Sequence, residues 1–319
     1  MKIIGTGSAL PKKIVTNMDL EKMMDTSDEW IRSRTGIGTR HLAVEETTTS
    51  MSVEAAKQAM EAAGITAEEL DLIVAATVTA DRLIPTLSCE VQSELGAKNA
   101  VAFDLSAGCS GFLFALATVH AQFLTGYYKK ALVIGAETLS KIMDWEDRST
   151  CVLFGDGAGA VVVSAEEDSL LSVRLGSDGA SGMVLNCPGR LKKNPFVEQK
   201  LEETNFVHME GQAVYKFAVR TVPKAVNQVL EEAGIAVDDV SLFLLHQANL
   251  RIIEAVAKRL KQPLEKFPTN MEQNGNVSAA SIPILLDEVC RKGLIKKGDI
   301  IVMSGFGAGL TWGACVFRW

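Results

Sequence analysis

A single cysteine stands where a buried strand gives way to a helix. Residues 101–105 form a strand-like run, and an apolar helical pattern begins at Phe112, three residues after Cys109. A thiol in this position lies at the positive end of the helix dipole, beside backbone N–H groups that lack helical partners. That setting lowers a thiol pKa and offers donors to a developing oxyanion. We therefore predict that Cys109 is a nucleophile; the alternative is a small buried residue at a tight turn.

Two polar residues occupy comparable positions later in the chain. His246 ends the apolar run 242–245, and the carboxyl ends of strands in α/β folds face the binding crevice. Asn276 lies in the turn at residues 273–278, which opens another predicted helix. Taken alone, the histidine is typical of a satisfied structural group and the asparagine of a capped turn. Beside a reactive thiol, however, both can stabilise negative charge on a substrate oxygen.

An internal repeat predicts how these residues come together. The pattern of residues 63–76 recurs at 233–246, and that of residues 130–135 recurs at 299–304. Each copy of the longer match follows a helical pattern and ends in an apolar run typical of a strand buried on both faces. The turn that carries Cys109 then corresponds to the turn that carries Asn276. We expect two similar α/β units packed face to face.

Composition and charge exclude several classes of function. The chain has 319 residues, 47% of them hydrophobic and 22% charged, with a net charge of −7. This acidic balance argues against a nucleic-acid binder, and no apolar stretch reaches the roughly 18 residues of a membrane span. The six cysteines show no CxxC pair and no metal-ligand spacing. We interpret them as reduced thiols of a cytoplasmic protein and expect no metal site.

Taken in order, six motifs resemble those of the β-ketoacyl-acyl-carrier-protein synthase III family, within the thiolase-like condensing enzymes. The resemblance covers essentially the whole chain. It implies an α/β thiolase-like fold in which duplicated βαβαβαββ halves form a five-layered αβαβα architecture. Residues 1–170 would hold the nucleophile, and residues 171–319 the histidine and asparagine. The motifs are TSDEWI (26–31), RTGI (34–37), AGCSG (107–111), FGDGAGA (154–160), HQANLR (246–251) and NGN (274–276).

The resemblance implies a decarboxylative Claisen condensation that initiates type II fatty-acid synthesis. Cys109 would take the acyl group of an acyl-CoA primer, most simply acetyl-CoA, with branched primers as an option. Malonyl-acyl-carrier protein would then lose CO2 and attack, giving 3-oxoacyl-acyl-carrier protein. His246 and Asn276 would stabilise the enolate, and the backbone N–H groups of Cys109 and Ala308 the acyl-transfer oxyanion. The family resemblance implies no bound cofactor and a homodimer.

It also implies binding residues outside the catalytic set. Ile84 occupies the position that limits the primer pocket. Because a carrier protein is acidic, its docking patch should be basic even on an acidic chain. The residues implied for CoA are Thr26, Trp30, Arg34, Arg148 and Asn249, and those for the carrier protein are Gln247, Ala248, Asn249, Leu250, Arg251, Lys216, Lys258 and Arg259.

Three alternatives remain open at this point. A related condensing enzyme of secondary metabolism would load a different acyl donor with the same site residues. A non-catalytic acyl-CoA-binding or carrier-binding protein would share the fold, but the intact Cys-His-Asn set argues against it. A cysteine hydrolase would use His246 as the base for Cys109 and release a free acid without consuming malonyl groups.

Overall fold

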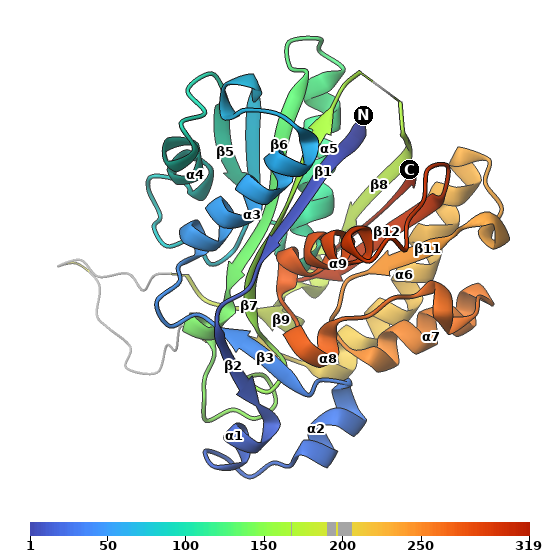
Figure 1. Ribbon diagram of the computed structural model, residues 1–319. Coiled ribbons are helices and arrows are strands. Elements are labelled where there is room, and N and C mark those ends of the chain that lie inside the picture. Colours follow the sequence, from blue (N-terminus) through green and yellow to red (C-terminus); the bar gives the residue numbers. More distant parts are fainter. Residues whose placement is uncertain (167, 190–195, 197–205) are drawn as a thin grey trace.

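The computed structural model describes residues 1–166, 168–189, 196 and 206–319 and contains two large β-sheets (Figure 1). Strands of the first sheet come from the N-terminal half of the chain, and strands of the second from the C-terminal half. The first sheet has the order β1 (Lys2–Ala9), β7 (Asp156–Ser164), β6 (Lys130–Thr138), β4 (Leu72–Ala76) and β5 (Val101–Leu105). The second has the order β11 (Leu242–Leu245), β12 (Ile300–Gly307), β13 (Thr311–Arg318) and β8 (Leu170–Ser177).

Helices cover both faces of both sheets and so produce five layers, as predicted. In the middle layer, α5 (Gly111–Phe123) and α9 (Ser281–Arg291) share one core with the inner faces of the two sheets. On the outside of the first sheet lie α3 (Thr48–Ala63) and α4 (Leu87–Leu95). On the outside of the second lie α6 (Gly211–Ala233) and α7 (Leu250–Leu260).

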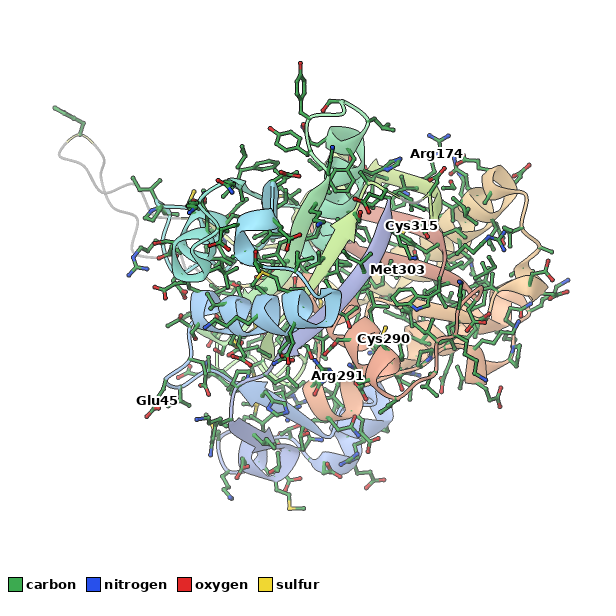
Figure 2. The ribbon with its side chains drawn as sticks, turned by 45° about the horizontal axis from the view of Figure 1, so that its top comes forward. Glu45, Arg174, Cys290, Arg291, Met303 and Cys315 are labelled. Atoms are coloured by element: carbon green, nitrogen blue, oxygen red, sulfur yellow. The ribbon has the colours of Figure 1, made fainter. Side chains whose placement is uncertain are left out.

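Side chains fill the space between these layers (Figure 2). Met303 of β12 and Cys315 of β13 are buried in the core that the two sheets share. At the end of α9, Arg291 donates to Asp287 on its own helix and to Gln58 on α3, which ties the middle layer to the outer one. Among the described residues, none of the helices is long and apolar enough to cross a membrane.

The two halves repeat the same order of elements with one exception. In the first half, β4 is parallel to both β5 and β6, and β6 is antiparallel to β7. In the second, β11 is parallel to β12, which is antiparallel to β13. The described residues between α7 and α9 contain no strand equivalent to β5, so the predicted βαβαβαββ order is one strand short there. Pro263 and Pro268 lack the N–H groups that a sheet ladder requires, and Phe267 instead stacks on Phe243 of β11.

A smaller layer lies at the end of the molecule where the labels α1 and α2 appear in Figure 1. It contains the antiparallel pair of β2 (Lys13–Thr16) and β3 (Thr39–Leu42), with α1 (Asn17–Glu21) and α2 (Asp28–Thr35). The fully buried Arg40 holds this layer to the body, because its guanidinium donates to Asn17 Oδ1 and to the Val152 carbonyl, both at 2.8 Å. Three short elements complete the fold: α8 (Met271–Asn274), β9 (Leu185–Asn186) and β10 (His208–Met209).

Candidate active site

Cys109 lies in a sharp turn between β5 and α5. The turn enters a single 3-10 turn, η2 (Gly108–Ser110), from which α5 continues. Gly108 has φ +52°, which side chains disfavour, and a Cβ there would approach the backbone N of Ala308 to 3.0 Å. The glycine therefore allows the chain to reverse against β12. This reversal places Cys109 at the start of α5, as the sequence predicted.

The ionisation of the thiol differs from the sequence prediction. Cys109 is 8% exposed, and burial raises its pKa to about 12, because a thiolate loses its hydration there. The Ser278 hydroxyl favours the thiolate, and the nearby Glu137 opposes it. In the free protein, desolvation therefore raises the pKa of Cys109, in contrast to the lowering that the sequence predicted. At neutral pH the thiol holds its proton until it reacts.

His246 directly follows β11, and its Nδ1 atom is hydrogen-bonded within the protein. Its Nδ1 lies 2.6 Å from the Ser281 hydroxyl, and its ring packs edge-on against Phe306. Burial lowers the pKa of His246 to about 3, so the ring is neutral. If the Ser281 hydroxyl donates to Nδ1, the hydrogen of the neutral ring lies on Nε2, which is then a donor. The Ser281 hydroxyl can instead donate to the Ser278 carbonyl, 2.8 Å away. It then accepts a hydrogen from Nδ1, and Nε2 is an acceptor. Nε2 can therefore serve either role.

Asn276 is oriented by its own turn. Its Oδ1 accepts the backbone N–H of Ser278 at 2.9 Å, and its backbone N–H donates to the Leu153 carbonyl at 2.9 Å. The carbonyl of Asn276 in turn accepts the Gly155 N–H at 3.0 Å. With the oxygen of the side chain occupied, the Nδ2 group is the part of Asn276 that can serve a ligand. An amide donor held in this way suits a developing oxyanion.

The three predicted catalytic residues line one cavity of about 120 Å³. The structure therefore brings together Cys109 from the first half and His246 and Asn276 from the second. β12 forms another wall: a Cβ on Gly307 would lie 2.6 Å from the Cys109 nitrogen, so the strand runs directly against the nucleophile. The following residue, Ala308, is the predicted second oxyanion donor. Further lining residues are Leu153, Phe154, Met209, Val214, Tyr215 and Phe306.

Two of the residues predicted to bind CoA touch each other. The Arg148 guanidinium lies 5.3 Å from the centre of the Trp30 ring, an arrangement that leaves a flat aromatic and a planar cation facing one another. Arg148 also pairs with the carboxylate of Asp25 at 3.5 Å. Near Trp30, the buried Thr26 hydroxyl oxygen has no hydrogen-bond partner among the described residues. Arg34 is exposed at the end of α2.

Asn249, predicted for both CoA and the carrier protein, has a structural task as well. Its Oδ1 caps α7 by accepting the Arg251 N–H at 2.9 Å, and its Nδ2 donates to the Arg34 carbonyl at 3.0 Å. It also lines the cavity. Asn249 therefore fixes the position of α2 relative to α7 at the cavity mouth.

The basic residues predicted for carrier binding are exposed, but one neighbouring residue is not. On the surface lie Lys216 of α6 and three residues of α7, namely Arg251, Lys258 and Arg259. Ala248 and Leu250 are half-buried. Gln247, in contrast, is fully buried: it donates to the Leu245 carbonyl and accepts the Asn270 N–H. Its side chain braces the loop and does not face a partner, contrary to the expectation of a carrier contact.

The residue predicted to limit the primer pocket lies outside the cavity of this chain. Ile84 is 84% exposed and is absent from the cavity lining. Sequence reasoning also missed Ser278, Ser281 and Glu137, which surround the catalytic residues. The serines follow Asn276 closely in the same turn, and a lone glutamate within the apolar run of β6 is a signal in itself, because buried carboxylates are rare.

Comparisons with known proteins relate the whole chain to one family. Residues 103–179 match the family 3-oxoacyl-[acyl-carrier-protein (ACP)] synthase III, and residues 230–319 match its C-terminal family. The β-ketoacyl-[acyl-carrier-protein] synthase III of Caldanaerobacter subterraneus is 52% identical, over 99% of this chain and 97% of that protein. This chain belongs to the synthase III family. Its thiolase-like fold is accordingly that of the family, as the motifs predicted.

Solved structures of synthase III proteins superimpose closely on this chain. The Aquifex aeolicus 3-oxoacyl-[acyl-carrier-protein] synthase III has a TM-score of 0.94 and 48% identity, covering 100% of this chain and 99% of its own. The priming β-ketosynthase of the R1128 polyketide biosynthetic pathway has a TM-score of 0.93 and 37% identity, covering 99% and 95%. A 3-oxoacyl-[acyl-carrier-protein] synthase III and a polyketide-priming β-ketosynthase thus share this architecture.

Proposed function

We propose that this synthase III family member condenses an acyl-CoA primer with malonyl-acyl-carrier protein to give 3-oxoacyl-acyl-carrier protein, CoA and CO2. The observation that supports this most directly is the cavity shared by Cys109, His246 and Asn276. It offers a nucleophile and two separate groups of hydrogen-bond donors, as two successive carbonyl reactions require. Acetyl-CoA is the proposed primer, and branched acyl-CoA a further option.

In the first half-reaction, the Cys109 sulfur attacks the thioester carbonyl of the primer. The backbone N–H groups of Cys109 and Ala308 are the proposed donors to the resulting oxyanion, because β12 runs directly against η2. Collapse of the tetrahedral intermediate expels the CoA thiolate and leaves an acyl group on Cys109. The buried cavity shields this thioester from water.

In the second half-reaction, the malonyl thioester loses CO2 and becomes an enolate. His246 Nε2 and Asn276 Nδ2 are the proposed donors to its oxygen. Ser281 permits this role of His246: when its hydroxyl donates to Nδ1, the ring hydrogen lies on Nε2. The enolate carbon then attacks the acyl group on Cys109, and the product leaves on the carrier protein.

Substrates would enter past α2 and α7. We assign the CoA adenine to the space between Trp30 and Arg148, whose side chains already face each other and would separate to admit it. The unpartnered Thr26 hydroxyl and the exposed Arg34 suit the polar parts of CoA. For the carrier protein we assign the exposed cations of α7, led by Arg251, together with Lys216.

We further propose a homodimer that pairs through β5. Among the described strands of the first sheet, β5 lies at an edge, and Val101 on it is 49% exposed. The neighbouring loop exposes Leu83 (67%) and Ile84 (84%). A second copy would cover these apolar groups, and Ile84 would then act at the boundary between subunits. Analytical ultracentrifugation of Val101→Lys should show dissociation, whereas the control Val44→Lys, at a site 74% exposed on another surface, should not.

The deciding experiment mixes labelled acetyl-CoA with malonyl-acyl-carrier protein and follows CO2 and acetoacetyl-carrier protein. The wild type should form both, and Cys109→Ser should form neither an acyl adduct nor acetoacetyl-carrier protein. Release of free acetate without CO2 would support the hydrolase instead. The second candidate is a condensing enzyme of secondary metabolism, because the chain also resembles the R1128 polyketide-priming enzyme. Kinetics with a panel of acyl-CoA primers distinguish it from a fatty-acid enzyme. We place the reaction in the cytoplasm, where thiols such as those of Cys89, Cys109, Cys151, Cys290 and Cys315 stay reduced.

A further inference from the structure

A buried carboxyl group lies behind the nucleophile and has no part in the mechanism above. Glu137, near the end of β6, is fully buried. Its Oε2 accepts the Val78 N–H at 3.1 Å and the hydroxyl of Thr79, with Thr77 Oγ1 at 3.4 Å. Its Oε1 accepts the Ser278 hydroxyl at 3.2 Å. Four donors thus satisfy the two oxygens of this buried carboxyl group.

Ser278 connects this carboxyl group to the reacting sulfur. Its side chain interacts with the Cys109 thiol as well as with Glu137. Its backbone has φ +46°, a conformation that non-glycine residues rarely adopt. Ser278 is 2% exposed, so its side chain is kept from bulk water. Strain that persists beside a nucleophile commonly has a function.

We propose, on the basis of the function proposed above, that Glu137 takes the proton of Cys109 through the Ser278 hydroxyl during acylation. The thiol S–H bond breaks as sulfur bonds to the primer carbonyl; Ser278 Oγ receives that proton and passes its own to Glu137 Oε1. CoA leaves as a thiolate and takes a proton from water. When the enolate later displaces the acyl group, Glu137 returns its proton by the same route, and the thiol is restored.

The surrounding groups fit this assignment. The groups that hydrogen-bond to the Glu137 carboxyl group are neutral hydroxyls and a backbone N–H, and Glu137 in turn opposes ionisation of the Cys109 thiol. Burial raises the pKa of Glu137 to about 7, while burial lowers that of His246 to about 3. The carboxylate is therefore the stronger base of the two in the free enzyme.

The test measures the two half-reactions separately in full-length variants. Single-turnover acylation by labelled acetyl-CoA should be at least about 100-fold slower in Glu137→Gln and Ser278→Ala. Decarboxylation of malonyl-carrier protein should change far less, because it needs no proton transfer from Cys109. Glu137→Asp, which keeps a carboxylate, should recover part of the acylation rate. As a matched control, Asp287→Asn removes another buried carboxylate, held by Thr6 and Ser8, and should acylate normally.

Two readouts distinguish proton transfer from a merely structural role. The wild-type acylation rate should rise with pH through about 7 as Glu137 ionises, and Glu137→Gln should lose that step. Infrared difference spectra should show a protonated carboxyl group appearing on acylation of the wild type only. A Glu137→Gln variant that acylates at the wild-type rate with the same pH profile would overturn the proton-transfer role of Glu137 and leave the proposed function standing. A wild type that never acylates would instead overturn the proposed function.

Discussion

Replacing Gly307 by alanine should disable Cys109 through the backbone. A Cβ at Gly307 would lie 2.6 Å from the nitrogen, 2.8 Å from the Cβ and 3.1 Å from the Cα of Cys109. These atoms belong to the main chain of η2 or sit directly on it, so rotation of a side chain cannot relieve the overlap. The turn that carries the nucleophile has to move away from β12.

The size of that movement sets the expected effect. Ordinary van der Waals contact begins at 3.4 Å, so the closest approach has to open from 2.6 Å by most of an ångström. A displacement of about 1 Å in a reacting group costs about 100-fold in rate. Overpacking of a core costs about 1–3 kcal/mol of the free energy of unfolding. We expect a folded protein whose acylation is about 100-fold slower.

Gly305→Ala is the matched control, two residues earlier on the same strand. A Cβ there would meet the end of the flexible Ile282 side chain at 3.2 Å, and the Cys109 carbonyl oxygen at 3.6 Å. Rapid-quench mass spectrometry of the acyl adduct gives the rate, and urea titration gives the stability. The reasoning is refuted if Gly307→Ala acylates like the wild type, or if Gly305→Ala is equally slow.

Three further predictions concern the site. His246→Ala or Asn276→Ala should reduce decarboxylation by about 100- to 1,000-fold, the usual loss for one oxyanion donor, while acylation persists; equal loss of both half-reactions contradicts this division. Arg251→Glu should raise the KM for malonyl-carrier protein and spare acetyl-CoA exchange, and Lys57→Glu on the exposed face of α3 should change neither. Burial raises the pKa of Glu137 from 4.5 to about 7, so the folded state keeps a proton that the unfolded chain releases. The free energy of unfolding therefore falls as pH rises from 4.5 to about 7. The urea midpoint of Glu137→Gln should lack this pH dependence.

Sequence periodicity and the internal repeat predicted two similar α/β units, whereas the five-layered architecture and the catalytic set were predicted from the resemblance to the synthase III family. Apolar runs predicted the strands β4 and β11, and the repeat predicted that the Cys109 turn corresponds to the Asn276 turn. The absence of a strand before α9 was harder to predict, since the family resemblance implied one there and only the prolines of that segment opposed it. Hydrophobic periodicity predicts helices and strands well. Whether a segment joins a sheet also depends on its backbone N–H donors, which a proline lacks.

Ionisation and long-range contacts could not be predicted from local pattern. Ser278 and Glu137 are 141 positions apart, and they meet because η7 (Ser278–Ala280) packs directly on β6. At Gly135 of β6, a Cβ would come within 2.3 Å of the Ala279 carbonyl oxygen. The helix terminus beside Cys109 was visible in the sequence, but the depth of burial that outweighs it is a property of both halves together.

Burial of the whole cluster reverses the usual order of its two bases. In water an imidazole binds a proton more tightly than a carboxylate, with pKa values near 6.5 and 4.3. Loss of hydration penalises the charged form of each, which is the protonated imidazole but the ionised carboxylate. The pKa of His246 accordingly falls to about 3 and that of Glu137 rises to about 7. Burial therefore keeps His246 neutral and makes the carboxyl group of Glu137 the stronger base of the two, in keeping with the role proposed for it.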